Sequence, residues 1–183
     1  MKEIRIHARA GQGAITTAAL LGYVYFLKGM YPYAFPHFGA ARMGAPMNAF
    51  VRVDNKPVRL RSQIYEPDYI IIVDSTLTRG FNCFSGLKDN GVAIVNYREG
   101  VDIPKVKPGQ KLFVVPANDI AMKAFGRPLG NTALLGAYAA ATKEISLDDL
   151  IAGIKKRFAG KSMEGNIEAA KQGYDFVLKN KSI

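Results

Sequence analysis

Hydrophobic and polar residues alternate at the start of the chain and then give way to a long apolar stretch. From Glu3 to Ala8 every second residue is apolar, which is the period of a half-buried β-strand. Residues 14–28 are rich in Ala and Leu, contain no Pro and are apolar on most faces. The pattern predicts a first strand followed by a helix that is buried on more than one side.

A glycine-rich turn, Ala10-Gly11-Gln12-Gly13, joins this strand to this helix. Gly adopts positive φ and lets other groups approach the main chain. Such a turn leaves backbone N–H groups unpaired at the positive end of the helix dipole, which suits an anion. The spacing matches neither G-x-G-x-x-G nor G-x-x-x-x-G-K-[ST], and no Lys follows to reach a phosphate. The motif alone therefore favours a plain turn in which small residues permit close packing.

Residues 29–46 combine prolines and glycines with Tyr31, Tyr33, Phe35 and Phe38. The breakers predict a loop, and the aromatic side chains indicate a loop with a defined shape. Aromatic area beside the planar cation of Arg42 suits a surface that docks a partner. A long loop folded onto its own domain would absorb the same aromatic side chains, so both interpretations stay open.

Two further alternating segments, residues 47–53 and 58–62, flank the turn residues 54–57 and predict a hairpin. Arg52, Arg59 and Arg61 would share one of its faces. A solvated face or a charge-protected edge is favoured there over an anion-binding strip.

The apolar run Tyr69 to Val73 predicts a strand covered on both sides, and residues 92–95 and 112–115 predict two more. Asp74 follows the first of these runs, where open α/β sheets place functional groups. Asp74-Ser75 also has the form of a helix N-cap, which is the commoner role. Cys83 has no His nearby in the sequence and is interpreted as a small packing residue.

The chain becomes helical from Ala117 onwards. Helices are predicted over residues 117–125, 131–142, 146–158 and 162–180, and Ser146 to Asp149 has the form of a capping box. Strands followed by helices indicate an α/β fold, a three-layer α/β/α sandwich around a mixed, mostly parallel sheet. Residues 1–183 are predicted to form a single domain.

Composition narrows the function further. The chain is 49% hydrophobic and 22% charged, as expected of a globular protein. One Cys cannot form an internal disulfide or hold an iron–sulfur cluster alone, and two His residues argue against a metal site. We expect a cytoplasmic protein with no membrane partner, because the sequence shows neither a secretory leader nor a membrane-length apolar run.

The net charge of +10 indicates either an acidic partner or a solvated basic surface. Lys and Arg are dispersed and no nucleic-acid module is present, so no nucleic-acid partner is expected. No Ser/His/Asp set, paired-carboxylate motif or metal cluster stands out. These patterns suggest a component of a larger assembly.

Four segments carry a family resemblance. They are IRIHARAGQGA (4–14), FPHFGAARMGAPMNAFVRVDNKPV (35–58), RSQIYEPDYIIIVDSTL (61–77) and GNTALLGAYAAAT (130–142). In that order they resemble the gamma subunit of pyruvate:ferredoxin oxidoreductase, over nearly the whole chain. The chain departs from the family's glycine-rich opening at Ala8 and Ala10, where glycines are common.

The resemblance implies a subunit of a complex that oxidatively decarboxylates a 2-oxoacid to acyl-coenzyme A and passes electrons to ferredoxin or flavodoxin. It implies alpha, beta and delta-type subunits as partners. Thiamine diphosphate, Mg and [4Fe-4S] clusters would lie on those chains, and the complex would also use coenzyme A. This chain would hold no cofactor alone, would be inactive in isolation and would supply structure, interface and part of the coenzyme A path.

The resemblance also suggests residue roles. Gly11, Gln12, Gly13 and Arg42 are the candidates for a cofactor phosphate, and no residue is assigned to catalysis or to a metal. The candidate subunit interface consists of Phe35, Pro36, His37, Phe38, Gly39, Arg42, Met43, Gly44 and Pro46. The motifs favour the pyruvate branch. A branched-chain 2-oxoacid or 2-oxoglutarate complex, or a free-standing nucleotide-binding α/β module, remains the alternative.

Overall fold

A computed structural model describes residues 1–38, 42–180 and 182. Its six strands form one sheet in the order β2-β3-β1-β4-β5-β6. The pairs β2/β3 and β3/β1 are antiparallel, and β1/β4, β4/β5 and β5/β6 are parallel. The predicted α/β class with a mixed, mostly parallel sheet is therefore confirmed. The strands are β1 (Lys2–Arg9), β2 (Tyr31–Phe38), β3 (Pro46–Asp54), β4 (Tyr69–Ile72), β5 (Val92–Asn96) and β6 (Lys111–Val115).

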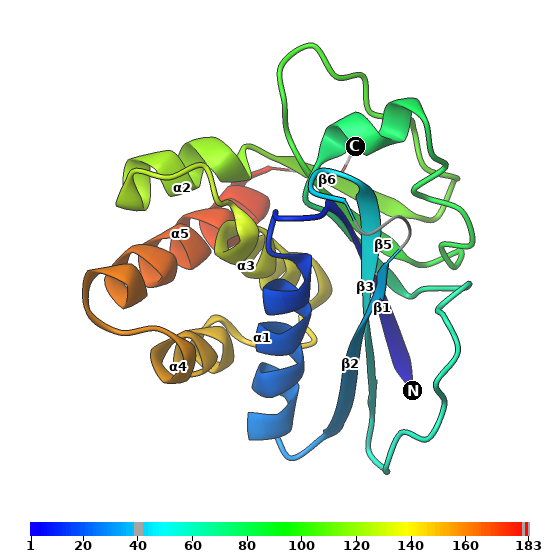
Figure 1. The fold of residues 1–183 in the computed structure, drawn as a ribbon, viewed down its shortest axis with the longest axis horizontal. Helices are drawn as coiled ribbons and strands as arrows, with labels where there is room; N and C mark the ends of the chain where they lie inside the picture. Colours follow the sequence, from blue (N-terminus) through cyan, green and yellow to red (C-terminus); the bar gives the residue numbers. More distant parts are fainter. Residues whose placement is uncertain (39–41, 181, 183) are drawn as a thin grey trace.

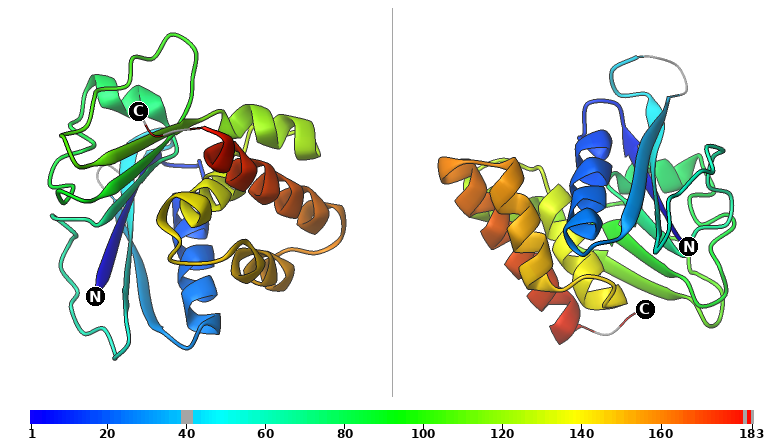
Figure 2. Two further views of the ribbon diagram at one scale, coloured as in Figure 1. Left: turned by 180° about the vertical axis from the view of Figure 1, so that it is seen from behind. Right: turned by 90° about the horizontal axis from the view of Figure 1, so that it is seen from below.

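The five α-helices in the described part of the chain lie together on one face of the sheet (Figures 1 and 2). The short 3₁₀-helix η1 (Ser75–Arg79) and irregular segments cover the other face, so the third layer of the sandwich contains little regular helix. None of the described helices is long and apolar enough to cross a membrane. The helices are α1 (Ala14–Leu27), α2 (Ala117–Phe125), α3 (Asn131–Thr142), α4 (Leu147–Arg157) and α5 (Gly160–Lys179).

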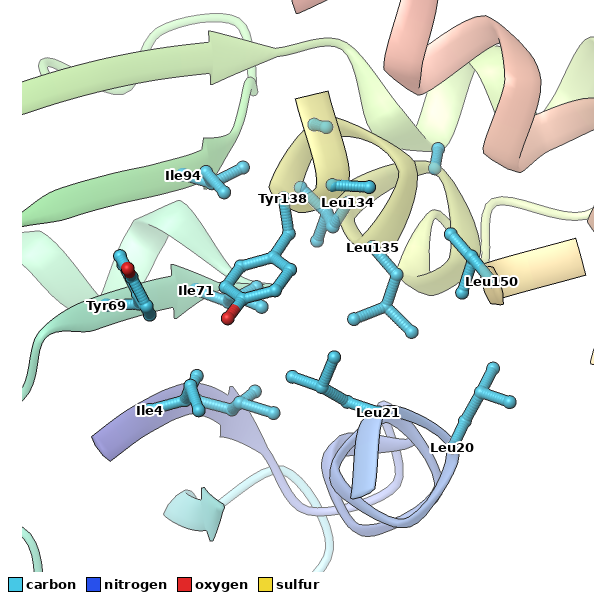
Figure 3. Close-up of a cluster of buried hydrophobic side chains, with 14 of the residues drawn as sticks. Ile4, Leu20, Leu21, Tyr69, Ile71, Ile94, Leu134, Leu135, Tyr138 and Leu150 are labelled. Carbon is cyan, nitrogen blue, oxygen red and sulfur yellow. The ribbon is translucent and has the colours of Figure 1, made fainter. Parts of the chain in front are cut away.

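The main core lies between the sheet and the helices. Figure 3 shows Tyr138 of α3 lying between Tyr69 of β4 and Leu21 of α1. The Tyr138 ring meets the Tyr69 ring edge-on with centroids 5.4 Å apart, and its hydroxyl is 2.7 Å from that of Tyr25. Helices α3 and α5 cross so closely that a Cβ on Gly136 would collide with the Ala170 carbonyl oxygen. Only Gly permits this crossing.

Two predictions about the N-terminal half are wrong. Residues 31–38 of the supposed loop 29–46 form strand β2, and β3 pairs with β2 instead of with residues 58–62, which form no strand. Prolines suggested a loop, but β2 is the outer strand of the sheet. An edge strand tolerates Pro because its outward N–H groups have no partner in the sheet. The hairpin is therefore β2–β3.

The second face of the sheet is held by two buried arginines. Arg5 donates to the carbonyl oxygens of residues 64, 65, 83 and 85 and, through Nε, to His7 Nε2 at 3.1 Å. Burial and the neighbouring Arg5 charge lower the pKa of His7 to about 3, so its imidazole is neutral and can accept this bond. All five N–H groups of Arg5 are therefore engaged.

Arg52 is 1% exposed, which corrects the prediction that it shares a solvated face with Arg59 and Arg61. Its Nε donates to Glu3 Oε1 at 2.8 Å, and its remaining N–H groups bind the carbonyl oxygens of residues 60, 62 and 63. Sequence periodicity could not separate a buried arginine from a solvated one. Arg52 is buried because the irregular segment that contains residues 60–63 folds back over β3.

Replacing Arg52 by Met is expected to destabilise the protein by about 3 kcal/mol, because Glu3 and three carbonyl groups lose their hydrogen-bond partner. The midpoint of urea unfolding measures this loss. The matched control is Arg59→Met, since Arg59 is exposed. Equal stability of the two variants would contradict a structural role for Arg52.

Candidate functional site

The glycine-rich turn packs against the chain that follows Arg42. Gly11 and Gly13 have φ of +95° and +77°, which explains the choice of Gly at both positions. Ala10 N donates to Ala45 O at 2.8 Å, and Gly44 N donates to Ala10 O at 3.0 Å. Two segments that the sequence suggested for a cofactor phosphate therefore lie together.

A polar cluster fixes the turn to the end of β4. The Gln12 side chain accepts from Arg9 N at 2.8 Å and donates to Asp74 Oδ2 at 2.7 Å. Arg9 Nε is 3.2 Å from the same Asp74 oxygen, and Arg9 Nη2 donates to Thr76 Oγ1. Gln12 thus acts as a brace between β1 and the segment that follows β4, through its amide oxygen and one of its two amide N–H groups.

Asp74 is the N-cap of η1, as the commoner sequence interpretation predicted, and accepts from Thr76 N at 3.0 Å. Burial opposes its ionisation, but the Thr76 and Gln12 hydrogen bonds and the Arg9 charge together hold the pKa of Asp74 below its ordinary value. The carboxylate is therefore ionised and structural at neutral pH.

The start of α3 is fixed to the same turn. Asn131 Nδ2 donates to Gln12 O at 3.0 Å and to Thr17 Oγ1 at 2.8 Å. Behind it, Asn96 of β5 accepts from Asn118 N, and Asn118 Oδ1 accepts from Gly130 N. The N-termini of α1 and α3 consequently meet at the carboxyl ends of β1 and β5, the usual ligand position in open α/β sheets.

A cleft of about 1050 Å³ opens beside these two helix N-termini. Gly11, Gln12 and Gly13 lie on its wall, while Arg42 is not among the residues that line it. Arg127 and Lys161 contribute positive charge, Glu164 and Glu168 contribute negative charge, and the apolar part of the wall comes from Leu20, Phe125, Leu129, Leu135 and Phe158. The cleft can hold an elongated ligand with one anionic end.

The predicted interface residues fall into one that packs against the chain itself and others that are exposed. Phe35 is partly buried, with its ring 4.9 Å from Tyr33 and 5.1 Å from Phe50, so it packs on its own domain. Exposed positions are Pro36, His37, Arg42, Met43, Gly44 and Pro46. Phe38 ends β2, and Gly39 lies outside the described residues.

Sequence reasoning missed Arg9, Asn131, Arg127 and Lys161 as parts of this region. Arg9 directly precedes the turn, so its position at the end of a strand was an available signal. Asn131 is the first residue of an Ala-rich helix and looks like an ordinary helix start. Only the packing of α2, α3 and α5 brings Asn131 to the turn and places Arg127 and Lys161 along the cleft beside it. Among the described residues, no group of three or more His, Cys, Asp or Glu could hold a metal ion.

Asp74→Asn is expected to lower stability at pH 7 by about 2 kcal/mol, because charge-assisted bonds from Arg9 and Gln12 are weakened. The lowered pKa means that this contribution is present above about pH 4 and is lost as the pH falls further. The difference between wild type and variant should therefore shrink below pH 4 in urea titrations. Asp175→Asn, at an exposed position, is the control. A difference that grows on acidification would contradict this role.

Comparison with known proteins agrees with the four motifs. The family model described as pyruvate ferredoxin/flavodoxin oxidoreductase matches residues 3–176. The pyruvate synthase subunit PorC of Methanothermobacter thermautotrophicus is 44% identical, with 98% of this chain and 97% of that protein covered. The pyruvate/ketoisovalerate oxidoreductases common subunit gamma of Pyrococcus furiosus is also 44% identical, with 96% of each chain covered.

A solved structure shares the fold. The crystal structure of pyruvate oxidoreductase subunit PORC from Thermotoga maritima superimposes with a TM-score of 0.82 at 33% identity, covering 95% of each chain. The residues that the family model matches include the glycine-rich turn and most of the C-terminal helices. The chain therefore belongs to the pyruvate ferredoxin/flavodoxin oxidoreductase family, where it corresponds to the gamma subunit.

Proposed function

We propose that this chain works as the gamma subunit of a multi-subunit oxidoreductase whose substrate is pyruvate. The observation that carries this proposal is the full-length similarity to proteins named as subunits of pyruvate synthase and of pyruvate/ketoisovalerate oxidoreductases. The single Cys83 is buried, and burial raises the pKa of its thiol to about 11, which suits the packing role expected of it.

The complex would convert a 2-oxoacid and coenzyme A into acyl-coenzyme A and CO₂, with two electrons passing to ferredoxin or flavodoxin. Thiamine diphosphate, Mg and [4Fe-4S] clusters would belong to alpha, beta and delta-type subunits. The gamma chain would provide a rigid surface for these subunits and one wall of the coenzyme A path. A cytoplasmic location is part of the same proposal.

The residues that line the cleft beside the glycine-rich turn suit one side of a coenzyme A binding site. Two helix N-termini, Arg127 and Lys161 suit a phosphate group, and the apolar residues suit the uncharged part of the molecule. Glu164 and Glu168 oppose an anion and would restrict the phosphate to the other end of the cleft. Gly11, Gln12 and Gly13 would meet that phosphate, and Arg42 would approach from the segment packed on the turn.

The same chain could also serve a complex that acts on a second 2-oxoacid. A relative of 44% identity is named as a subunit common to pyruvate and ketoisovalerate oxidoreductases. A gamma chain that serves two complexes would explain why its sequence says little about the 2-oxoacid. A free-standing nucleotide-binding module is the remaining alternative, and it requires nucleotide binding by the isolated chain that Gly13→Val abolishes.

Affinity purification of this chain from its source cells without oxygen is expected to recover larger subunits that bring thiamine diphosphate and iron. Pyruvate-dependent reduction of ferredoxin should accompany them, and a parallel assay with 2-oxoisovalerate identifies a shared subunit. A chain recovered alone under mild conditions would contradict the proposal and favour the nucleotide-binding module.

Gly13→Val and, separately, Arg42→Ala are each expected to raise the KM of the assembled complex for coenzyme A by about tenfold, because Val at the positive φ of Gly13 would distort the turn and Arg42→Ala would remove a phosphate contact. The KM for pyruvate should not change. Steady-state kinetics with varied coenzyme A measure both values, and Arg98→Ala is the exposed-arginine control. Unchanged assembly and unchanged coenzyme A saturation in Arg42→Ala would remove Arg42 from the site.

A further inference from the structure

Helix α1 exposes an apolar stripe that its own domain does not cover. Ile15, Tyr23 and Phe26 are 44%, 37% and 61% exposed, and Ala19 is exposed between them. Their spacing of three and four residues places them on one side of the helix. Residues 14–27 contain no charged side chain, although a surface helix of a globular domain normally has a polar face.

The stripe forms one wall of a groove between α1 and β2. The groove has a volume of about 680 Å³ and lies at the outer edge of the sheet. Exposed contiguous apolar area of this kind marks an interaction surface. The groove is lined by Ala19, Gly22, Tyr23, Phe26, Gly29, Met30, Tyr31, Pro32, Tyr33, Ala34, Pro57, Val58 and Arg61.

Arg61 is the only charged residue among those lining residues. Its guanidinium stacks on the Tyr33 ring at 4.0 Å, and its Nη1 donates to Val58 O at 2.9 Å. Neither Nε nor Nη2 bonds to any other described residue, and Arg61 forms no ion pair with them. These two nitrogens form the fork that binds a carboxylate with two parallel hydrogen bonds.

The edge strand itself is closed to strand pairing. Pro32 and Pro36 remove backbone donors from β2, whose other side is already paired with β3. A partner would therefore contact side chains in the groove and not extend the sheet. The positive surroundings, with Lys56 and Arg59 exposed near Arg61, favour an acidic partner surface.

We propose that the groove between α1 and β2 docks another subunit of the oxidoreductase, which inserts an apolar side chain flanked by a carboxylate that pairs with Arg61. This inference rests on the proposed function and names the surface that performs it. Aromatic residues and Arg contribute most of the energy in many interfaces, which matches Tyr23, Phe26 and Arg61. The exposed residues between Pro36 and Pro46 would then be a separate contact region.

The test measures binding of purified variants to the co-expressed alpha, beta and delta-type subunits. Phe26→Asp should weaken binding at least about tenfold, and Arg61→Ala about fivefold with reduced salt dependence. Controls are Leu178→Asp, at an apolar position of α5 that is 62% exposed, and Arg98→Ala. Unchanged thermal midpoints of the isolated variants would show that they are folded.

Wild-type binding by Phe26→Asp would overturn the proposed surface while leaving the subunit function intact. A wild-type chain that fails to bind those subunits would instead overturn the proposed function. A third result, in which the isolated chain dimerises and Phe26→Asp abolishes only the dimer, would assign the groove to a second copy of this chain and contradict the proposal.

Discussion

Two buried guanidinium groups hold in place the layer that covers the sheet on the face opposite the α-helices. A buried arginine must place its N–H groups on acceptors, because an unpaired charge in the interior is very costly. Arg5 and Arg52 meet this requirement with the carbonyl groups of irregular segments 60–65 and 83–85. These segments thus have a fixed position over the sheet without forming regular structure.

Strand β1, which carries Arg5, connects this layer to the candidate site. β1 carries Glu3, Arg5, His7 and Arg9 on the side away from the α-helices, and Ile4, Ile6 and Ala8 toward them. Its apolar side anchors the helical core, and its last arginine braces the glycine-rich turn through Asp74. The turn is therefore held rigidly relative to the sheet. A rigid scaffold of this kind allows a subunit to present a binding surface, or one side of a ligand site, to its partners.

Much of the fold could be predicted from hydrophobic periodicity. The first strand and helix, the buried run at β4, the capping box at Ser146 with Asp149 and the C-terminal helices appear near their predicted positions. The last helix begins earlier than predicted, because α5 starts at Gly160 and not at residue 162. The strand β2 was missed because Pro32 and Pro36 indicate a loop unless the strand is known to lie at an edge.

The site was predictable only in part. The glycines of the turn carry a local signal, but the contact of Asn131 with that turn, and the positions of Lys161 and Arg127 along the same cleft, depend on helix packing that no local pattern encodes. Burial of Arg52 depends likewise on a long-range fold-back. The family resemblance supplied the function, since the residues themselves offered no catalytic set, and whether residues 1–183 behave as one domain stays a prediction.

The most direct test of the proposed subunit role is reconstitution of pyruvate-dependent ferredoxin reduction from purified alpha, beta and delta-type subunits, with and without this chain. We expect the chain alone to be inactive, to join the other subunits in a fixed ratio, and to be required for their full activity. Full activity without the chain, or failure of the chain to join the complex, would contradict its role as a working subunit.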